Sequence, residues 1–200
     1  MRKIIFATGN EGKMREIREI FKGTPYEVLS MKEAGISADI VEDGTSFEEN
    51  ALIKARAVAK LSGEIAMADD SGLVVDFLGG APGIYSARFL GEDTSYEIKN
   101  QYILDQLKGV LPSGRTARFV CAIAVVFPDG ESGVRVATVE GRIADAPAGD
   151  NGFGYDPIFY VPEFGLTTAQ LSMEQKNKIS HRAKALEAVK REVLCAGTDV

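Results

Sequence analysis

The first 21 residues of the chain combine a short strand with an amphipathic helix. Ile4–Ala7 is an apolar, β-prone run, and the turn Thr8–Lys13 separates it from a segment whose apolar residues recur at helical spacing from Met14 to Phe21. A second strand is expected at Tyr26–Leu29. This strand–turn–helix unit predicts an α/β fold.

The rest of the chain continues the same mixture of elements. The further predicted strands are 65–68, 118–127, 134–143 and 157–161, and the further predicted helices are 47–61, 95–107 and 181–194. The turn Pro128–Gly130 joins two of these strands into a hairpin. We therefore predict one domain over residues 1–200, with a mixed sheet and flanking helices, because no linker or internal repeat interrupts the pattern.

Composition excludes several classes of protein. The chain carries 23 Lys and Arg against 29 Asp and Glu, a net charge of −6, which argues against a nucleic-acid-binding module. No run of about 18 apolar residues is present, so we predict no membrane span. Cys121 and Cys195 are far apart and have no metal-binding spacing, which predicts reduced thiols in a cytoplasmic protein.

The turn after the first strand is a candidate phosphate site. Gly9 and Gly12 allow backbone N–H groups to approach an anion, and the start of the helix adds partial positive charge. Lys13 adds a full charge, and Thr8 and Asn10 supply further donors. The alternative is an ordinary turn with a helix cap, since short glycine-rich turns are common.

A pair of carboxylates is a candidate metal and catalytic site. Asp69 and Asp70 follow a predicted strand directly, and Glu42 lies in a loop ahead of the helix 47–61. Adjacent carboxylates repel each other unless a cation compensates, and Mg²⁺ takes carboxylate oxygens together with phosphates. The alternative is a turn, because Asp-Asp-Ser-Gly is typical of turns.

Two later segments are candidates for recognising a nucleoside. Phe153 lies on a glycine-rich loop, where its ring can stack on a base, and Asp156 can accept hydrogen bonds from a base or sugar. Lys176, His181 and Arg182 form a set of donors suited to a keto oxygen or a phosphate. The alternatives are a core aromatic beside a turn and a structural histidine at a helix start.

Taken in order, these segments resemble the inosine triphosphate pyrophosphatase family. The matching segments are Thr8–Lys13, Asp69–Leu73, Gly80–Arg88, Gly152–Pro157 and Ser180–Arg182. The resemblance extends from residue 2 to about residue 194. The Gly80–Arg88 segment matches well, but its chemistry assigns it no role.

The resemblance implies an elongated, two-lobed α/β domain with a central cleft, and usually a homodimer. It implies Mg²⁺-dependent hydrolysis of ITP, dITP and XTP to the monophosphate and pyrophosphate. The residues that match the triphosphate-binding turn are Thr8, Gly9, Asn10, Glu11, Gly12 and Lys13. Glu42 and Asp70 match metal ligands, and Asp70 also matches the proton acceptor. The matches to substrate contacts are Ser71, Phe153, Gly154, Tyr155, Asp156, Lys176, His181 and Arg182.

These residues predict a mechanism and leave rival functions open. We expect Lys13 to hold the leaving phosphates and Asp70 or Asp69 to take the proton of a water that attacks the α-phosphorus. One rival is a related pyrophosphatase for modified pyrimidine nucleotides. Another is a nucleotide sensor without catalysis, which has no need of a general base.

Overall fold

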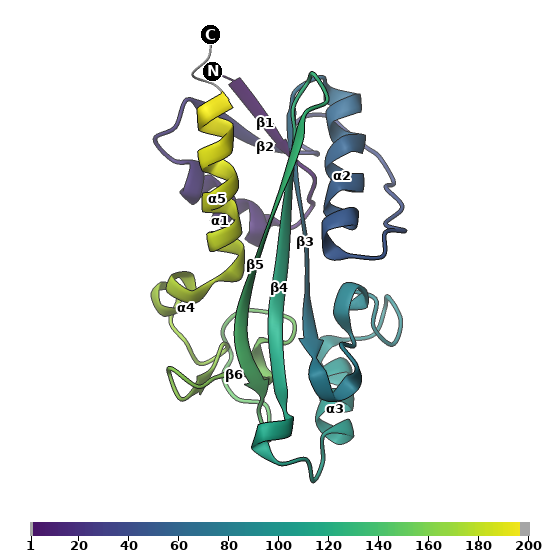
Figure 1. Cartoon of the computed structure of the whole chain (residues 1–200), viewed down its shortest axis with the longest axis vertical. Coiled ribbons are helices and arrows are strands. Elements are labelled where there is room, and N and C mark those ends of the chain that lie inside the picture. The colour runs from purple at the N-terminus through teal and green to yellow at the C-terminus, as the bar shows by residue number, and fades with distance from the viewer. Residues whose placement is uncertain (1, 197–200) are drawn as a thin grey trace. The chain divides into compact units, whose positions relative to one another are not determined.

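The computed structural model describes residues 2–196 of the chain. Its seven strands form one sheet in the order β2-β1-β3-β4-β5-β6-β7. The strands are β1 (Arg2–Phe6), β2 (Tyr26–Ser30), β3 (Ile65–Val75), β4 (Thr116–Val126), β5 (Ser132–Ile143), β6 (Phe159–Val161) and β7 (Leu166–Thr167). The helices are α1 (Glu11–Phe21), α2 (Phe47–Ser62), α3 (Tyr96–Gln106), α4 (Met173–Ile179) and α5 (His181–Ala196) (Figure 1).

Parallel and antiparallel pairs both occur in the sheet. β1 pairs in parallel with β2 and β3, whereas β6 pairs antiparallel with β5 and β7. The predicted α/β fold with a mixed sheet and flanking helices is confirmed.

The chain divides into two compact units. Unit 1 consists of the described residues within Met1–Asp70, Cys121–Ala137 and Arg182–Val200, and unit 2 consists of Ser71–Val120 and Thr138–His181. The three longest strands, β3, β4 and β5, contribute residues to both units. A single domain with a central cleft stays a prediction.

The central strands of unit 1, β1, β3 and β4, are buried on both faces, and their side chains alternate between two apolar clusters. One cluster joins α1 and α5 to Ile4, Phe6, Ile65, Met67, Cys121, Ile123 and Val125. The other joins α2 to Ile5, Ala7, Ala66, Ala68, Ala122, Ala124 and Val126. Within β3, Ile65 and Met67 therefore face α1 and α5, and Ala66 and Ala68 face α2.

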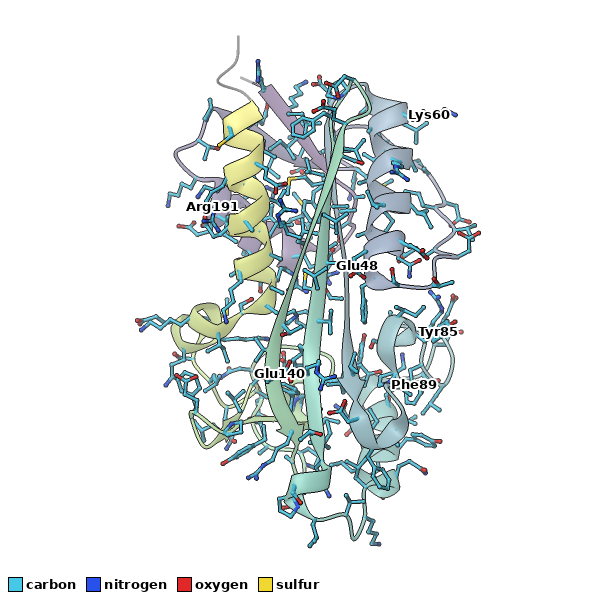
Figure 2. The ribbon with its side chains drawn as sticks, viewed as in Figure 1. Glu48, Lys60, Tyr85, Phe89, Glu140 and Arg191 are labelled. Atoms are coloured by element: carbon cyan, nitrogen blue, oxygen red, sulfur yellow. The ribbon has the colours of Figure 1, made fainter. Side chains whose placement is uncertain are left out.

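Small side chains line the contact between α2 and the sheet. Ala51, Ala55 and Ala59 of the helix are buried in the same cluster as the alanines of β3 and β4. Methyl groups on both sides allow a close approach of helix and sheet. Glu48 in the first turn of α2 and Lys60 in its last turn complement the helix dipole (Figure 2).

Unit 2 has its own apolar core. Its buried members are Leu73, Val75, Ile103, Leu104, Leu107, Ala117, Val139, Ile143, Tyr155, Ile158, Phe159 and Val161. The guanidinium of the buried Arg115 donates to the carbonyls of Leu107, Ile143 and Ala144. This side chain ties the end of α3 to the end of β5.

Several predicted element boundaries differ from those of the structure. β3 does not end at Ala68 but continues through Asp69 and Asp70, because each carboxylate has partners on its own face of the strand. α3 begins at Tyr96, one residue later than predicted, because Ser95 is its cap and the Ser95 hydroxyl accepts from the N–H of Ile98. β6 begins at Phe159, after a single 3₁₀ turn.

No helix within residues 2–196 is both long and apolar enough to cross a bilayer. Neither Cys121 nor Cys195 forms a disulfide, as the sequence predicts.

Candidate active site

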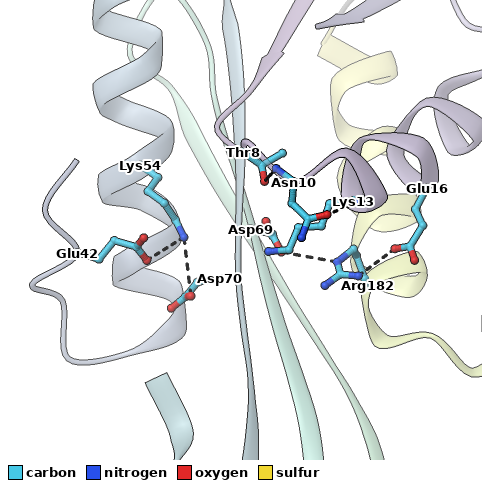
Figure 3. A network of polar contacts seen from close by, with 9 residues as sticks. All are labelled: Thr8, Asn10, Lys13, Glu16, Glu42, Lys54, Asp69, Asp70 and Arg182. Atoms are coloured by element: carbon cyan, nitrogen blue, oxygen red, sulfur yellow. Dashed lines mark hydrogen bonds and ion pairs between the residues drawn. The ribbon is translucent and has the colours of Figure 1, made fainter. Parts of the chain in front are cut away.

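Asp69 and Asp70 project from opposite faces of β3. Successive residues of a strand point to opposite sides of the sheet, so Asp69 continues the face of Met67 and Asp70 continues the face of Ala68. Figure 3 shows Asp69 directed toward α1 and Arg182, and Asp70 directed toward α2. Two neighbouring carboxylates therefore have separate environments within unit 1.

Asp69 is the centre of a buried ionic network. The carboxylate is 2% exposed, and its Oδ2 atom lies 2.7 Å from Nζ of Lys13 and 3.6 Å from Nε of Arg182. Arg182 donates through Nη1 to Oε2 of Glu16 at 2.9 Å (Figure 3). Helices α1 and α5 are thereby tied to the middle of β3.

Neighbouring cations determine the charge state of Asp69. Burial by itself would raise the pKa of this carboxyl, but Lys13 and Arg182 outweigh burial and hold the pKa well below its usual range. Asp69 is therefore ionised throughout the physiological pH range and is a poor proton acceptor.

The predicted phosphate-binding turn leads into α1, as the sequence indicates. Asn10 caps the helix, because its Oδ1 atom accepts from the N–H of Lys13 at 3.0 Å. The hydroxyl of Thr8 accepts from the N–H of Asn10 at 3.1 Å. The space around Gly9 is open, and Glu11 and Gly12 are exposed in the first turn. The Asn10 cap fits the alternative of an ordinary capped turn, and phosphate binding by the helix start and Lys13 stays a prediction.

Asp70 is held by residues of α2 and the loop before it. Its Oδ2 atom accepts from Nδ2 of Asn50 at 3.1 Å. The ammonium of Lys54 lies 2.8 Å from Oε2 of Glu42 and 3.8 Å from Oδ1 of Asp70. Asn50 also accepts from the N–H of Gly44 at 2.9 Å, which fixes the loop beside the carboxylate.

The electrostatic balance at Asp70 is opposite to that at Asp69. Burial raises the pKa of Asp70 to about 6, and the charges of Glu42 and Asp69 act in the same direction against Lys54 and Asn50. A carboxylate with a pKa near neutrality is suited to accepting a proton. When environments push the pKa values of two carboxylates apart, the two take different chemical roles.

Glu42 and Asp70 form the donor set with the chemistry of a magnesium site. Among residues 2–196, no three His, Cys, Asp or Glu side chains are grouped to hold a metal. Mg²⁺, however, is commonly held by one or two carboxylates together with substrate phosphates. Glu42 and Asp70 share the ammonium of Lys54, so this pair already accommodates one cation. The residues present therefore fit the predicted ion.

In unit 2, Asp156 shapes the loop that carries Phe153. Asp156 is buried, and its Oδ2 atom accepts from the N–H of Phe153 at 2.8 Å and from Nζ of Lys176 at 2.6 Å. Its Oδ1 atom accepts from the hydroxyl of Thr168 at 2.8 Å. Gly152 has φ +77°, and a side chain there would overlap the Asp156 carboxylate. The Asp156 carboxylate therefore holds the loop in its conformation.

The ring of Phe153 is presented at the surface of this loop. Phe153 is 51% exposed, and Nζ of Lys176 lies 5.4 Å from its ring centroid. Tyr155 is buried, which raises its pKa, and its hydroxyl donates to the carbonyl of Ser86 at 2.8 Å. An exposed ring on an anchored loop is suited to stacking on a base.

The three predicted donors have different partners. Lys176 pairs with Asp156, and Arg182 is buried against Asp69 and Glu16. The ring of His181 is parallel to that of Phe119, with centroids 5.4 Å apart. Ser71 is half-buried in β3, next to Asp70. The substrate contacts of these residues stay predictions.

Sequence reasoning missed Glu16, Asn50, Lys54 and Thr168. Asn50 and Lys54 carried a detectable signal, since they lie four residues apart on a helix face that otherwise consists of alanine and valine. Polar side chains on an apolar helix face need a polar partner in the folded protein. The other two residues gave no comparable signal.

Comparison with known proteins identifies the family of this chain. The profile of the Ham1 family matches residues 4–192. The chain is 52% identical over 196 residues to a dITP/XTP pyrophosphatase of Caldanaerobacter subterraneus, with 97% of each chain covered. It is 48% identical over 191 residues to the dITP/XTP pyrophosphatase of Bacillus subtilis, with 96% of each covered.

Solved structures show the same relationship. The Ham1 protein of Staphylococcus aureus matches with a TM-score of 0.89 and 44% identity, covering 98% of this chain and 100% of that one. A HAM1 protein from Coxiella burnetii matches with a TM-score of 0.90 and 39% identity, covering 97% and 99%. Sequence profile, curated relatives and fold agree over nearly the whole chain, and the chain therefore belongs to the Ham1 family.

Proposed function

We propose that this protein hydrolyses the non-standard purine nucleoside triphosphates ITP, dITP and XTP to the nucleoside monophosphate and pyrophosphate. The observation that carries the proposal is the contrast between Asp69 and Asp70 on the two faces of β3. Asp69 stays ionised because Lys13 and Arg182 lower its pKa against the effect of burial. Burial raises the pKa of Asp70 to about 6, and this carboxylate lies beside the proposed cation site. The names of the two relatives above support the choice of substrate.

We assign a role in this reaction to Lys13, Asp69 and Asp70 of unit 1. Lys13 and the N–H groups at the start of α1 bind the phosphates that leave as pyrophosphate. Asp70 takes a proton from a water whose oxygen forms a bond to the α-phosphorus, while the bond from the α-phosphorus to the bridging oxygen breaks. Asp69 holds Lys13 in place and takes no proton.

Mg²⁺ is the proposed cofactor, held by Glu42 and Asp70. A bound ion would neutralise phosphate charge and would favour ionisation of the attacking water. Asn50 keeps the Asp70 carboxylate oriented through its hydrogen bond to Oδ2. The ammonium of Lys54 lies between the carboxylates of Glu42 and Asp70 and holds them together.

Selectivity for the base is assigned to unit 2. Phe153 stacks on the purine, and donors from Lys176 or His181 meet a 6-keto oxygen. Adenine has an amino group at this position, which leaves buried donors unpaired at roughly 1–3 kcal/mol each. One such mismatch gives only about 10- to 150-fold discrimination, so several contacts act together.

The test is pyrophosphate release from ITP, XTP, dITP, ATP, GTP and dTTP, with Mg²⁺ and with excess EDTA. We expect rapid release from ITP, XTP and dITP only, and its loss with EDTA. Faster turnover of pyrimidine nucleotides would favour the pyrimidine-directed rival. Tight binding of ITP without pyrophosphate release would favour a nucleotide sensor.

We further propose that the protein is a homodimer that works in the cytoplasm. Large apolar side chains are exposed over one stretch of unit 2, which is where a second copy would pack. They are Phe77, Tyr85, Leu90, Tyr96, Ile98, Tyr102 and Leu111. Tyr85 is labelled in Figure 2. The two cysteines without a disulfide agree with a reducing compartment.

Light scattering after gel filtration tests the dimer. We expect a mass twice the 21.5 kDa of one chain. The double change Ile98→Lys and Leu111→Lys places charge on the exposed apolar stretch and should give a monomer. A wild-type monomer at micromolar concentration would contradict the proposal.

A further inference from the structure

Helix α3 carries two buried polar residues that the proposed reaction does not use. Lys99 and Asn100 are 1% and 6% exposed, although neither is paired with a charged group in a described ion pair. We propose that Asn100 is a positioning residue for base recognition, which acts by holding the carbonyl of Gly154 in the loop that presents Phe153. The inference rests on the proposed function, in which this loop binds the purine.

Asn100 makes a direct contact with the loop. Its Nδ2 atom donates to the carbonyl oxygen of Gly154 at 3.1 Å. This contact also settles the orientation of the amide, because a carbonyl accepts only from the nitrogen. Gly154 follows Phe153 directly, so the hydrogen bond fixes the Gly154–Tyr155 peptide group, one residue after the exposed ring.

The loop has a conformation that needs such an anchor. Gly154 has φ +69° and Gly152 has φ +77°, and glycine is the residue least constrained in this left-handed region. Without a fixed contact, glycines on both sides of Phe153 give the ring many accessible orientations. Asp156 holds the N–H of Phe153, and Asn100 holds the carbonyl of Gly154.

The same helix also holds a second segment against the loop. Lys99 donates to the carbonyl of Ala87 at 2.6 Å, and the neighbouring carbonyl of Ser86 accepts from the hydroxyl of Tyr155 at 2.8 Å. The ring of Tyr96 packs edge-on against that of Tyr155, with centroids 5.2 Å apart. The Gly80–Arg88 segment, which sequence chemistry left without a role, thus supports the loop together with α3.

Asn100 stabilises the fold less than its hydrogen bond to Gly154 alone would suggest. Its Oδ1 atom is buried and has no hydrogen-bond partner among the described residues. A buried acceptor without a partner opposes folding, and an apolar side chain of similar size would remove that cost. What the apolar side chain would not supply is the hydrogen bond to Gly154, and that contact is the function we assign to Asn100.

The experiment compares wild-type protein with Asn100→Leu and Asn100→Asp. The first variant removes the amide, and the second keeps its shape but replaces the donor with an acceptor. The matched control is Gln101→Leu on the same helix, where the exposed side chain bonds only to Asp105 in the contacts shown. For each protein we would measure kcat and KM for ITP, the inhibition constant of tripolyphosphate, and Tm.

For both variants we expect KM for ITP to rise about tenfold. This rise corresponds to a fall of the binding-competent loop conformation to roughly a tenth of the population. The value of kcat should stay within about twofold. The inhibition constant of tripolyphosphate, which has no base, should stay unchanged. Tm of Asn100→Leu should stay within about 4 °C of wild type. Gln101→Leu should match wild type in every measurement.

The outcomes separate the inference from the proposed function. Absence of pyrophosphate release from ITP by the wild type would overturn both. Turnover by the wild type with an unchanged KM in both Asn100 variants would overturn the inference alone. An equal rise in KM for ITP and in the tripolyphosphate constant would also overturn it, because a general disturbance of the protein would then explain the result.

Discussion

Replacing Asp70 with asparagine should lower kcat for ITP by about a thousandfold. A positioned general base contributes roughly 10²–10⁴-fold to a rate, and an amide cannot take the proton of the attacking water. The amide oxygen can still accept from Nδ2 of Asn50, so the side chain should keep its place in β3. We therefore expect the KM for ITP to change only a few-fold.

The measurement is steady-state pyrophosphate release at saturating Mg²⁺, so that weaker binding of the ion does not limit the rate. Asp129→Asn, in the exposed turn between β4 and β5, serves as the control and should keep the wild-type kcat. An Asp70→Asn variant with wild-type kcat would refute the assignment of Asp70 as the base.

Replacing Asp69 with asparagine should instead destabilise the fold. The carboxylate is 2% exposed, and its loss leaves Lys13 and the buried Arg182 without their shared anion. Removing one partner of a buried ion pair costs about 3–5 kcal/mol. For a chain of this length we expect Tm to fall by roughly 10 °C.

Thermal unfolding followed by circular dichroism measures this effect. Glu19→Gln is the matched control, because Glu19 pairs with Lys22 at the surface of α1 and both side chains are about three-quarters exposed. Exposed pairs of this kind contribute little to stability, so Tm should not change. A wild-type Tm for Asp69→Asn would show that the network around Asp69 does not stabilise the fold.

The sequence predicts the elements of this fold better than the environment of its carboxylates. The apolar runs in β1 and β4 predict strands, and the structure confirms them. Asp-Asp-Ser-Gly is typical of a turn, yet β3 continues through it, because ionic partners on each face compensate for residues that strands disfavour. Once the strand is extended through Asp70, its period of two places the carboxylates on opposite faces.

The partners of those carboxylates could not be predicted from local sequence. Lys13 is 56 residues from Asp69, and Arg182 is more than 100 residues away. The sequence assigns Arg182 to the nucleoside site because it lies near Lys176 in the chain. The structure places Arg182 in the Asp69 network, since α5 packs on the same face of the sheet as α1.

The role of Asp156 could not be predicted from the sequence, for a related reason. A carboxylate on a glycine-rich loop suggests an acceptor for a ligand, but both oxygens of Asp156 bind groups of the protein itself. A loop with several glycines has little intrinsic order, and an internal acceptor is what fixes it. Composition alone does not distinguish an acceptor for a ligand from one that holds the loop.

The layer of alanine side chains between α2 and β3 sets the distance between this helix and Asp70, the proposed general base. Asn50 and Lys54 lie on the helix face that contributes Ala51 and Ala55 to this layer, and they meet Asp70 on the facing strand. The thickness of two methyl groups thus sets how far these side chains must reach. A larger residue in the layer would move Asn50 and Lys54 away from Asp70 and would weaken the contacts that hold this carboxylate in place.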